Sequence, residues 1–189
     1  MARTKEFSPD EALQSAMEVF WQKGYEATSM RDLLERTKLH KASLYQTFGN
    51  KERLFISALK RFCMSALEPF KAISKSATPL SDLKQLMLTV CSSSDPSNGC
   101  MLANTAAEVA TRNDNIAAVV QDSLNKRQQM LRAILIQAQD VGELSKAADV
   151  KVLAEYLNTF LMGFGVMMRM NTDKRQMVQT LETAFAQLK

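Results

Sequence analysis

Apolar residues recur at intervals of three and four along most of the chain, which is the spacing of one face of an α-helix. The first such segment lies between Ser8 and Gly24 and keeps its apolar residues on one side (Leu13, Ala16, Met17 and Phe20). Ser8 with Glu11 forms a capping-box pattern, and Pro9 suits the first helical position. Gly24 suits the residue that follows the last turn. The pattern therefore predicts a helix between these two ends.

Two short helices are predicted next. One begins at Thr28 or Ser29 and is broken by residues 37–40, and the other spans Lys41 to Phe48. Gly49-Asn50 ends the second one, and a long helix begins near Lys51. A longer first helix followed by two short helices across a tight turn is the architecture of a helix-turn-helix DNA-binding domain.

The rest of the chain continues the helical pattern. Further helices are expected to begin at Pro79 and to span Cys100–Arg112, Ile116–Gln139, Asp149–Asn171 and Asp173–Leu188, with a polar loop at Ser92–Gly99. This gives about nine helices and no convincing strand, so we expect an all-α protein. We expect a three-helix helix-turn-helix domain in residues 1–50, joined to a six-helix domain in residues 51–189.

Positive charge is concentrated in the predicted DNA-binding region. The net charge of the chain is only +4. Residues 36–61, however, carry one acidic side chain, Glu52, and seven basic ones (Arg36, Lys38, Lys41, Lys51, Arg53, Lys60 and Arg61). A local basic surface attracts DNA phosphates. Such clusters also occur on ordinary solvated faces, so this one supports DNA binding only together with the helix-turn-helix pattern.

The residues of this region resemble those of a known family. The segments TSMRDLL at 28–34 and KASLYQTFGNKERLF at 41–55 are similar to the DNA-binding domain of the TetR family, as are Phe20 and the Gly24-Tyr25 pair. The resemblance implies a homodimer whose two heads reach successive major grooves of a double-stranded DNA operator. It also implies a C-terminal domain that encloses a ligand cavity and dimerises through its last two long helices. The expected function is repression of transcription, relieved by a small hydrophobic or electrophilic and oxidising inducer.

The candidate DNA contacts lie on the second and third predicted helices. Small residues at 42 and 43 allow the recognition helix to enter the major groove, and Lys41 and Gln46 are placed to reach phosphate or base edges. A hydroxyl and backbone N–H groups at the start of the second helix suit a phosphate. The family pattern adds Tyr45 and Lys51 as two further phosphate contacts. The full set is Thr28, Ser29, Lys41, Ala42, Ser43, Tyr45, Gln46 and Lys51.

The sequence departs from the family pattern in the turn. Lys38 stands where the family usually has Gly, at a position expected to need positive φ. His40 replaces the usual Ser or Thr cap and is a weaker cap. We interpret His40 as a solvated turn residue.

The predicted dimer interface lies in the last two helices. The first of them carries a broad apolar surface (Tyr156, Leu157, Phe160, Leu161, Phe164 and Met168), and Gly163 and Gly165 allow close helix approach. The second carries Met177, Val178, Leu181, Ala184, Phe185 and Leu188 on one side. An interface between two copies is favoured over a purely internal core.

The candidate inducer site is apolar. Twelve methionines suit a cavity that adapts to varied apolar ligands, although each one separately is more typical of a core. The residues considered as lining are Met87, Met101, Met130, Met162, Met167, Phe160 and Phe164. Asn104, Glu108 and Arg112 are either its polar side chains or, for Glu108 and Arg112, a surface ion pair four residues apart.

Cys100 is the candidate reactive residue. It is expected in the first turn of a helix, where the helix dipole stabilises a thiolate. Gly99-Cys100-Met101-Leu102 is similar to a subset of TetR-type repressors that carry Gly-Cys at this helix start, and in some of these the cysteine senses electrophiles or oxidants. The alternative, a small buried residue that supports the helix start, is favoured for Cys100 and still more for Cys63 and Cys91.

Other classes of protein are less well supported. The sequence has no metal-type cluster, glycine-rich phosphate loop or nucleophile–base pair, so we expect neither a small helical enzyme nor a cofactor or metal. The apolar second half argues against nonspecific DNA compaction. A ligand-independent regulator or an activator of the same fold stays open. The longest apolar run, Phe160–Met168, is about half the ~20 residues of a membrane span, and no signal segment is evident. We expect a cytoplasmic protein without a membrane partner.

Overall fold

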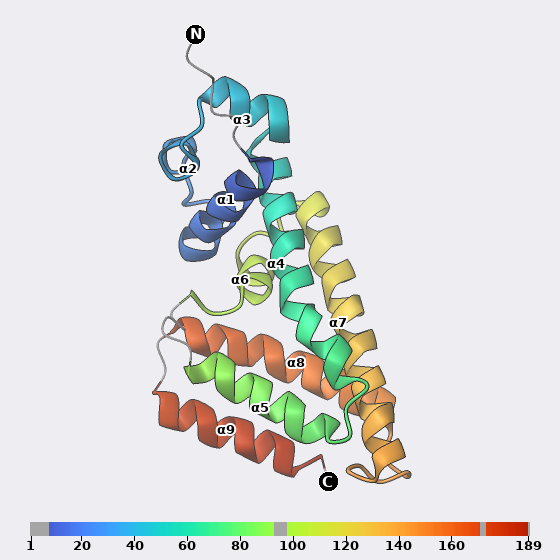
Figure 1. Ribbon diagram of the computed structural model, residues 1–189. Coiled ribbons are helices and arrows are strands. Elements are labelled where there is room, and N and C mark those ends of the chain that lie inside the picture. The colour runs from blue at the N-terminus through green and yellow to red at the C-terminus, as the bar shows by residue number, and fades with distance from the viewer. Residues whose placement is uncertain (1–7, 93–97, 171–172, 189) are drawn as a thin grey trace.

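The computed structural model describes residues 8–92, 98–170 and 173–188. These residues form nine α-helices and no β-strand (Figure 1). The helices are α1 (Pro9–Lys23), α2 (Met30–Thr37), α3 (Lys41–Phe48), α4 (Lys51–Ile73), α5 (Pro79–Ser92), α6 (Met101–Glu108), α7 (Asp114–Val141), α8 (Val150–Arg169) and α9 (Lys174–Ala186). The predicted all-α fold is confirmed. Most of the predicted polar loop, residues 93–97, and the predicted helix end at Asn171 lie outside the described residues.

The ends of the first helices follow their capping residues. The Ser8 hydroxyl accepts a hydrogen bond from the N–H of Glu11 at 3.4 Å, and Gly24 ends α1 with φ of 85°. Ser29 and Asp32 form a reciprocal capping box, in which the Ser29 N–H donates to the Asp32 carboxylate at 2.8 Å and the Asp32 N–H donates to the Ser29 hydroxyl at 3.1 Å. The second helix therefore begins after Ser29.

The turn between α2 and α3 has the conformation predicted from its sequence. Lys38 ends α2 in the left-handed region with φ of 59°, and it is the one non-glycine residue with positive φ in the described part of the chain. His40 is the N-cap of α3 but makes no side-chain capping hydrogen bond. Lys38 therefore has the positive φ expected where the family usually has Gly, and His40 does not cap α3 with its side chain.

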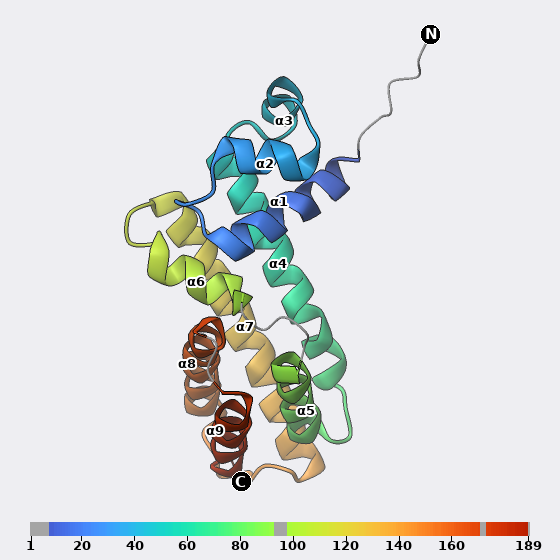
Figure 2. The ribbon, with the colours of Figure 1, turned by 90° about the vertical axis from the view of Figure 1, so that its left-hand side faces the viewer.

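Two long helices connect the two ends of the molecule. In Figures 1 and 2, α4 and α7 run from the region of α1–α3 to the opposite end, where α5, α8 and α9 gather. α4 packs against α1, α5, α6 and α7, whereas α7 packs mainly against α4 and α8. α4 therefore joins the predicted helix-turn-helix domain directly to the rest of the protein.

The buried side chains form two cores. One unites α1–α4 with α6 and the first half of α7, around Phe20, Leu33, Leu44 and Phe55. The other unites the end of α4 with α5, α8, α9 and the second half of α7. Because α4 contributes to both cores, the division at residue 50 stays a prediction.

The helix predicted over Cys100–Arg112 is shorter than expected. α6 ends at Glu108, and Thr105 O accepts hydrogen bonds from the N–H groups of both Val109 and Ala110. The bond from Ala110 spans five residues, so the last turn is wider than an α-turn. Val109 then leaves the helix with φ of −133°. Cys100 is the N-cap of α6 and not a residue of its first turn.

Candidate DNA-binding surface and ligand cavity

The exposed face of α3 carries the residues predicted to contact bases. Lys41, Ala42 and Gln46 are exposed, and Ser43 and Tyr45 are half-buried. The opposite face holds Leu44, which is fully buried in the core. This one-sided burial fixes which side chains of α3 are free to enter a groove.

Ion pairs divide the basic cluster of residues 36–61 into two groups. Arg36 pairs with Glu18 and Arg61 pairs with Asp10, so these two guanidinium groups brace α2 and α4 against α1. No ion pair in the described part of the chain involves Lys38, Lys41 or Lys51. The lysines around α3 therefore supply most of the positive charge that remains available to phosphates.

Two of these lysines, Lys41 and Lys51, lie over aromatic rings. The Lys51 ammonium group lies 4.5 Å from the centroid of the Tyr25 ring and donates a hydrogen bond to the carbonyl of Glu26 at 3.5 Å. Lys41 lies 5.8 Å from the centroid of the Tyr45 ring. These cation–π contacts hold the two lysines over aromatic rings while leaving their charge uncompensated.

Thr28 does not have the free hydroxyl that was predicted. Its side chain is 1% exposed, and its hydroxyl donates to the carbonyl of Gly24 at 2.6 Å. The hydroxyl of Thr28 therefore closes the turn between α1 and α2. The exposed residue at the start of α2 is Ser29, one position later. The predicted hydroxyl contact of Thr28 with phosphate is therefore corrected.

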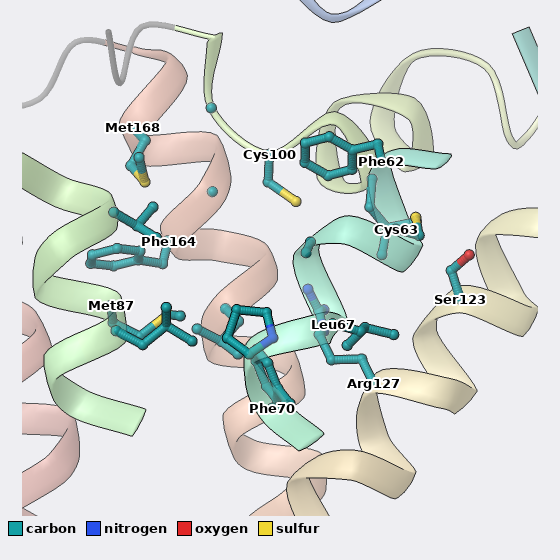
Figure 3. A pocket seen from close by; sticks show the side chains of 18 of the residues that line it. Phe62, Cys63, Leu67, Phe70, Met87, Cys100, Ser123, Arg127, Phe164 and Met168 are labelled. Carbon is teal, nitrogen blue, oxygen red and sulfur yellow. The ribbon is translucent and has the colours of Figure 1, made fainter. Parts of the chain in front are cut away.

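A cavity of about 310 Å³ lies beneath the DNA-binding helices. Its wall is almost wholly apolar and is formed by residues of α1, α4, α5, α6, α7 and α8 and of the segment before α6. Figure 3 shows Met87, Phe164 and Met168 on one side, Phe62, Cys63 and Cys100 on the other, and Arg127 reaching in from α7. A largely apolar cavity with few polar groups is typical of a small-molecule site.

Three of the predicted ligand residues line this cavity, namely Met87, Cys100 and Phe164. Met101, Met130, Met162 and Phe160 instead pack in or against the two cores, and Met167 is 39% exposed. A methionine or aromatic stripe at helical spacing does not distinguish a cavity wall from a core, and here most of the stripe is core.

The predicted polar side chains of the cavity have other partners. Glu108 accepts hydrogen bonds from the N–H groups of Tyr25, at 3.1 Å, and Glu26, at 2.9 Å. Asn104 donates to the carbonyl of Asn98 at 2.9 Å. Glu108 and Arg112 do not pair, because α6 ends at Glu108 and Arg112 no longer lies one helical turn away. None of these three lines the cavity.

The polar groups of the cavity are Ser123 and Arg127, which the sequence reasoning missed. Both lie on α7 four residues apart, on the stripe that is otherwise formed by buried apolar residues, including Val119, Val120 and Leu131. The missed signal was therefore a pair of polar residues at core positions of an amphipathic helix.

The cysteines have different environments. Cys63 and Cys91 are buried, as predicted, and Cys100 is half-buried. Burial raises the pKa of Cys63 to about 11, and burial also raises the pKa of Cys91. A Cβ on Gly165 would lie 2.5 Å from the Cβ of Cys100, so Gly165 allows the close approach that was predicted. At Gly163 a Cβ would meet no atom of the same chain within 4 Å, so close approach there stays a prediction that concerns a second copy.

Three residues connect the DNA-binding helices to the cavity. Trp21 of α1 lines the cavity, and its indole N–H donates to the carbonyl of Gly99 at 3.0 Å. Arg169 at the end of α8 donates to the carbonyls of Trp21, at 3.2 Å, and Gln22, at 3.3 Å. With Glu108 at the following turn, these bonds fix the C-terminal end of α1. A change in the cavity wall would therefore reach α1 directly.

The outer face of α8 is apolar and exposed. Its exposed apolar residues follow helical spacing (Val152, Tyr156, Met167 and Met170), with exposed Gly163 among them. Leu157, Leu161, Phe164 and Met168 are buried on the inner face. The apolar residues predicted to form one broad surface on this helix therefore belong to two faces. Only the outer face is available to a partner.

An exposed recognition helix on a helix-turn-helix domain, followed by a helical domain with a largely apolar cavity, is the architecture of a helix-turn-helix DNA-binding protein. Residues 12–58 match the family described as bacterial regulatory proteins, tetR family, and residues 79–184 match the tetracyclin repressor-like C-terminal domain. The chain belongs to the TetR family of transcriptional regulators.

Individual relatives extend over nearly the whole chain. The HTH-type transcriptional repressor ComR of Escherichia coli is 31% identical, over 96% of this chain and 89% of the relative. The uncharacterized HTH-type transcriptional regulator YezE of Bacillus subtilis is 27% identical over 100% of both chains. The structure of CifR, a TetR family regulator whose cysteine mutant was solved with a 26-bp double-strand operator DNA, superposes with a TM-score of 0.87 at 23% identity over 100% of both chains.

These comparisons also decide between the classes considered from the sequence. The matched families and relatives are transcriptional regulators, so the chain is a regulator and not an enzyme. Separately, the helices in the described part of the chain include none that is both long and apolar enough to cross a membrane.

Proposed function

We propose that the chain is a transcriptional repressor that binds operator DNA as a homodimer and leaves it when a small hydrophobic inducer fills the cavity. The observation that carries this proposal is the place of Trp21, which belongs to a DNA-binding helix and also lines the cavity. Occupancy of the cavity and the orientation of the head are thereby coupled through one side chain. The same geometry would serve an activator, which differs only in where its operator lies.

The proposed DNA contacts follow the exposed residues of α2 and α3. Lys41 contacts a phosphate or a guanine edge, and Gln46 contacts a base edge. Ala42 and Ser43 let the helix approach closely, while Tyr45 and Lys51 bind phosphates. At the start of α2, Ser29 and the backbone N–H groups that follow it bind a phosphate, and Thr28 takes part only through its backbone.

The proposed dimer forms through the outer face of α8 with α9 beside it. The exposed apolar stripe of α8 is the kind of surface that two copies cover in a four-helix bundle. Gly163 lies within that stripe and leaves room for a helix of the second copy. Two heads held in this way address major grooves separated by about one helical turn, roughly 34 Å. A DNA partner of this kind also supports a cytoplasmic location.

Release is proposed to act on the joint between α1 and the sensing domain. A ligand in the cavity presses on Trp21, Gly99 and Cys100, which lie on one wall. Arg169 and Glu108 hold the end of α1 in one position. A ligand that binds better to a second position of α1 shifts the population toward it, and the spacing between the two heads changes.

The test is binding of the purified chain to DNA from upstream of its own gene, measured by fluorescence anisotropy. We expect binding in the nanomolar range that survives an excess of unrelated DNA, because specific binding exceeds nonspecific binding by about 10³-fold or more. Equal affinity for unrelated DNA would contradict the proposal and favour nonspecific compaction. A promoter–reporter assay with and without the chain then separates a repressor from an activator.

A second candidate mode of release is reaction at Cys100. Its support is that Cys100 lines the cavity and packs closely against Gly165 of α8. In the test reaction the Cys100 sulfur loses its proton and attacks the methylene carbon of iodoacetamide, forming a C–S bond and releasing iodide. The adduct would push the start of α6 away from α8.

The variant Cys100→Ser should keep its DNA affinity and resist release by iodoacetamide, and Cys91→Ser, which changes a buried cysteine away from the cavity, should behave like the unmodified chain. Normal release of the Cys100→Ser protein would exclude this mode while leaving release by a noncovalent ligand intact.

A further inference from the structure

One charged group lies in the wall of the otherwise apolar cavity. Of the 19 lining residues, Arg127 alone carries a charge, and its side chain is only 8% exposed. Ser123, one turn earlier on α7, uses its hydroxyl to donate to the carbonyl of Val119 at 2.8 Å. Arg127 is therefore the one cation that a molecule in the cavity would meet.

The hydrogen bonds of Arg127 leave much of its guanidinium group unused. Its Nε donates to the Asn158 side-chain oxygen at 2.6 Å, and Nη2 donates to the Asn158 carbonyl at 3.1 Å. A guanidinium group has five N–H donors, so these bonds engage two of them. The remaining donors include both protons of Nη1.

The charge of Arg127 has no counter-ion among the residues that the structure describes. No carboxylate in the described part of the chain forms an ion pair with it. Burial lowers the pKa of Arg127, which is the expected direction for a cation removed from water without an anionic partner. Buried charges are normally paired, because desolvation otherwise costs free energy that neutral hydrogen bonds recover only in part.

A purely structural role explains only part of this arrangement. The two bonds to Asn158 tie α7 to α8, and Asn158 Nδ2 in turn donates to the carbonyl of Leu124 at 3.4 Å. A neutral donor would suffice for such a tie. A buried full charge at an apolar cavity is better suited to pair with an anion than to hydrogen-bond with a neutral amide.

We infer that the cavity binds an apolar molecule with a single anionic head, a carboxylate or an oxyanion of similar size, which pairs with Arg127. The inference rests on the proposed role of the cavity as the inducer site and names the class of inducer. The apolar wall excludes molecules with several charges or hydroxyl groups, since no other charged side chain lines the cavity. At a packing density of ~0.74, a cavity of about 310 Å³ holds roughly 230 Å³ of ligand, which suits a medium-chain or arylalkanoic acid.

The chain contains its own reporter for binding. Trp21 is the single tryptophan of the sequence and lines the cavity. Its fluorescence therefore reports a ligand in the cavity without any DNA. The probe pair is decanoate and 1-decanol, which share chain length and differ in the charge of the head, both used below the concentrations at which they aggregate.

We expect the full-length chain to bind decanoate about 10- to 100-fold more tightly than 1-decanol, which is the range of one hydrogen-bonded charge. Isothermal titration calorimetry gives the same two affinities independently. In Arg127→Met this preference should vanish, because decanoate affinity falls to that of decanol while decanol affinity stays unchanged.

A second variant keeps the test informative if Arg127→Met does not fold. Asn158→Asp places a carboxylate on the existing partner of Arg127 and keeps the two bonds from Arg127 to residue 158, while it loses the 3.4 Å bond from residue 158 to the Leu124 carbonyl. Decanoate affinity should fall at least about tenfold in this variant, whereas decanol affinity should remain. Circular dichroism confirms that the helices are intact.

The inference is overturned if 1-decanol binds as tightly as decanoate, if neither decanoate nor its six- to twelve-carbon homologues bind, or if both variants keep the preference for the acid. The proposed function fails separately. A chain that binds its operator but ignores the acid charge contradicts only the inference, and a chain that binds decanoate through Arg127 but lacks specific DNA binding contradicts only the proposed function.

Discussion

The indole N–H of Trp21 donates a hydrogen bond of 3.0 Å to the carbonyl of Gly99, although 78 residues separate the two in sequence. Trp21 lies near the end of α1, and Gly99 directly precedes the N-cap of α6. Arg169 of α8 donates hydrogen bonds to two backbone carbonyls of the same turn of α1. The helix-turn-helix domain (α1–α3) is thus held by contacts with residues next to the cavity. Its three helices should move together when these contacts change.

Loss of this contact should be measurable as lost stability. Trp21→Phe keeps an aromatic ring against Phe62, whose ring centroid lies 5.0 Å away, but removes the donor to Gly99. The expected cost is about 1 kcal/mol in the free energy of unfolding. Arg169→Met should cost a similar amount or more, because it removes charge-assisted bonds to two carbonyls.

The double variant tests whether the two residues act together. Since both hold the same turn of α1, their effects should differ from additivity by about 0.5 kcal/mol or more. Urea unfolding of the two single variants and the double variant gives the coupling energy. Additive effects would mean that Trp21 and Arg169 secure the head independently.

Lys38 should be replaceable by glycine with a gain in stability. Its φ of 59° places the Cβ in the left-handed region, which costs an L-residue roughly 1–2 kcal/mol. Because glycine also loses more chain entropy on folding, we expect Lys38→Gly to raise the free energy of unfolding by no more than about 1 kcal/mol. The measurement is urea unfolding monitored by circular dichroism.

Lys38→Ala is the matched control, since it removes the same charge but keeps a Cβ. It should be less stable than Lys38→Gly and no more stable than the unmodified chain. If both variants gained equally, the cause would be the lost charge and not the backbone conformation.

The helix-turn-helix could be predicted from the sequence because its signals are local. The Ser29–Asp32 cap, the Leu44 and Phe48 spacing and the positive φ at Lys38 each depend on residues within a few positions of one another. The order of the helices follows from the same periodicity and capping.

The cavity could not be predicted in the same way because it depends on long-range packing. Methionines on an apolar face belong to a core or to a cavity according to what the opposite helix leaves empty, and Met101 and Met87 differ only in this respect. Glu108 likewise found its partners 83 and 82 residues earlier, at Tyr25 and Glu26. Arg127 could have been identified from the sequence, however, because a charged residue on the apolar stripe of α7 does not fit the pattern of its neighbours.

Acid should destabilise the joint between α4 and α7. Glu52 accepts hydrogen bonds from the side-chain amides of Asn113, at 2.9 Å, and Asn115, at 2.8 Å, and these bonds lower its pKa from the ordinary value of 4.5. A carboxylate with a lowered folded-state pKa contributes stability above its unfolded pKa and loses it as the pH falls through the folded pKa. The free energy of unfolding should therefore decrease as the pH is lowered from about 5 toward about 3.

Glu52→Gln removes this titrating group, so its stability should fall less steeply with acid than that of the unmodified chain. Glu155→Gln, which changes an exposed glutamate of α8, serves as the control and should keep the original slope. Urea unfolding at successive pH values gives both slopes, and identical curves for Glu52→Gln and the unmodified chain would show that these bonds do not govern the acid response.

The division of roles on the DNA-binding surface is tested by Lys51 and Gln46. Lys51 is free of any ion pair in the described part of the chain and lies at the start of α4, where it is expected to meet phosphate. Lys51→Ala should weaken binding to every sequence and lower the slope of log affinity against log salt by about 1. Gln46 is exposed on α3, and Gln46→Ala should instead cost about 1–3 kcal/mol only on the preferred bases and relax discrimination there.

Anisotropy titrations against the operator and a set of single-base variants, at several salt concentrations, separate these two behaviours. Thr47→Ala is the matched control on α3, since its hydroxyl already donates to the carbonyl of Ser43 at 2.9 Å. It should change neither the salt slope nor the base preference. If the Lys51 and Gln46 variants lost affinity equally on every sequence, Gln46 would be a backbone contact, and sequence would be read by other residues of α3.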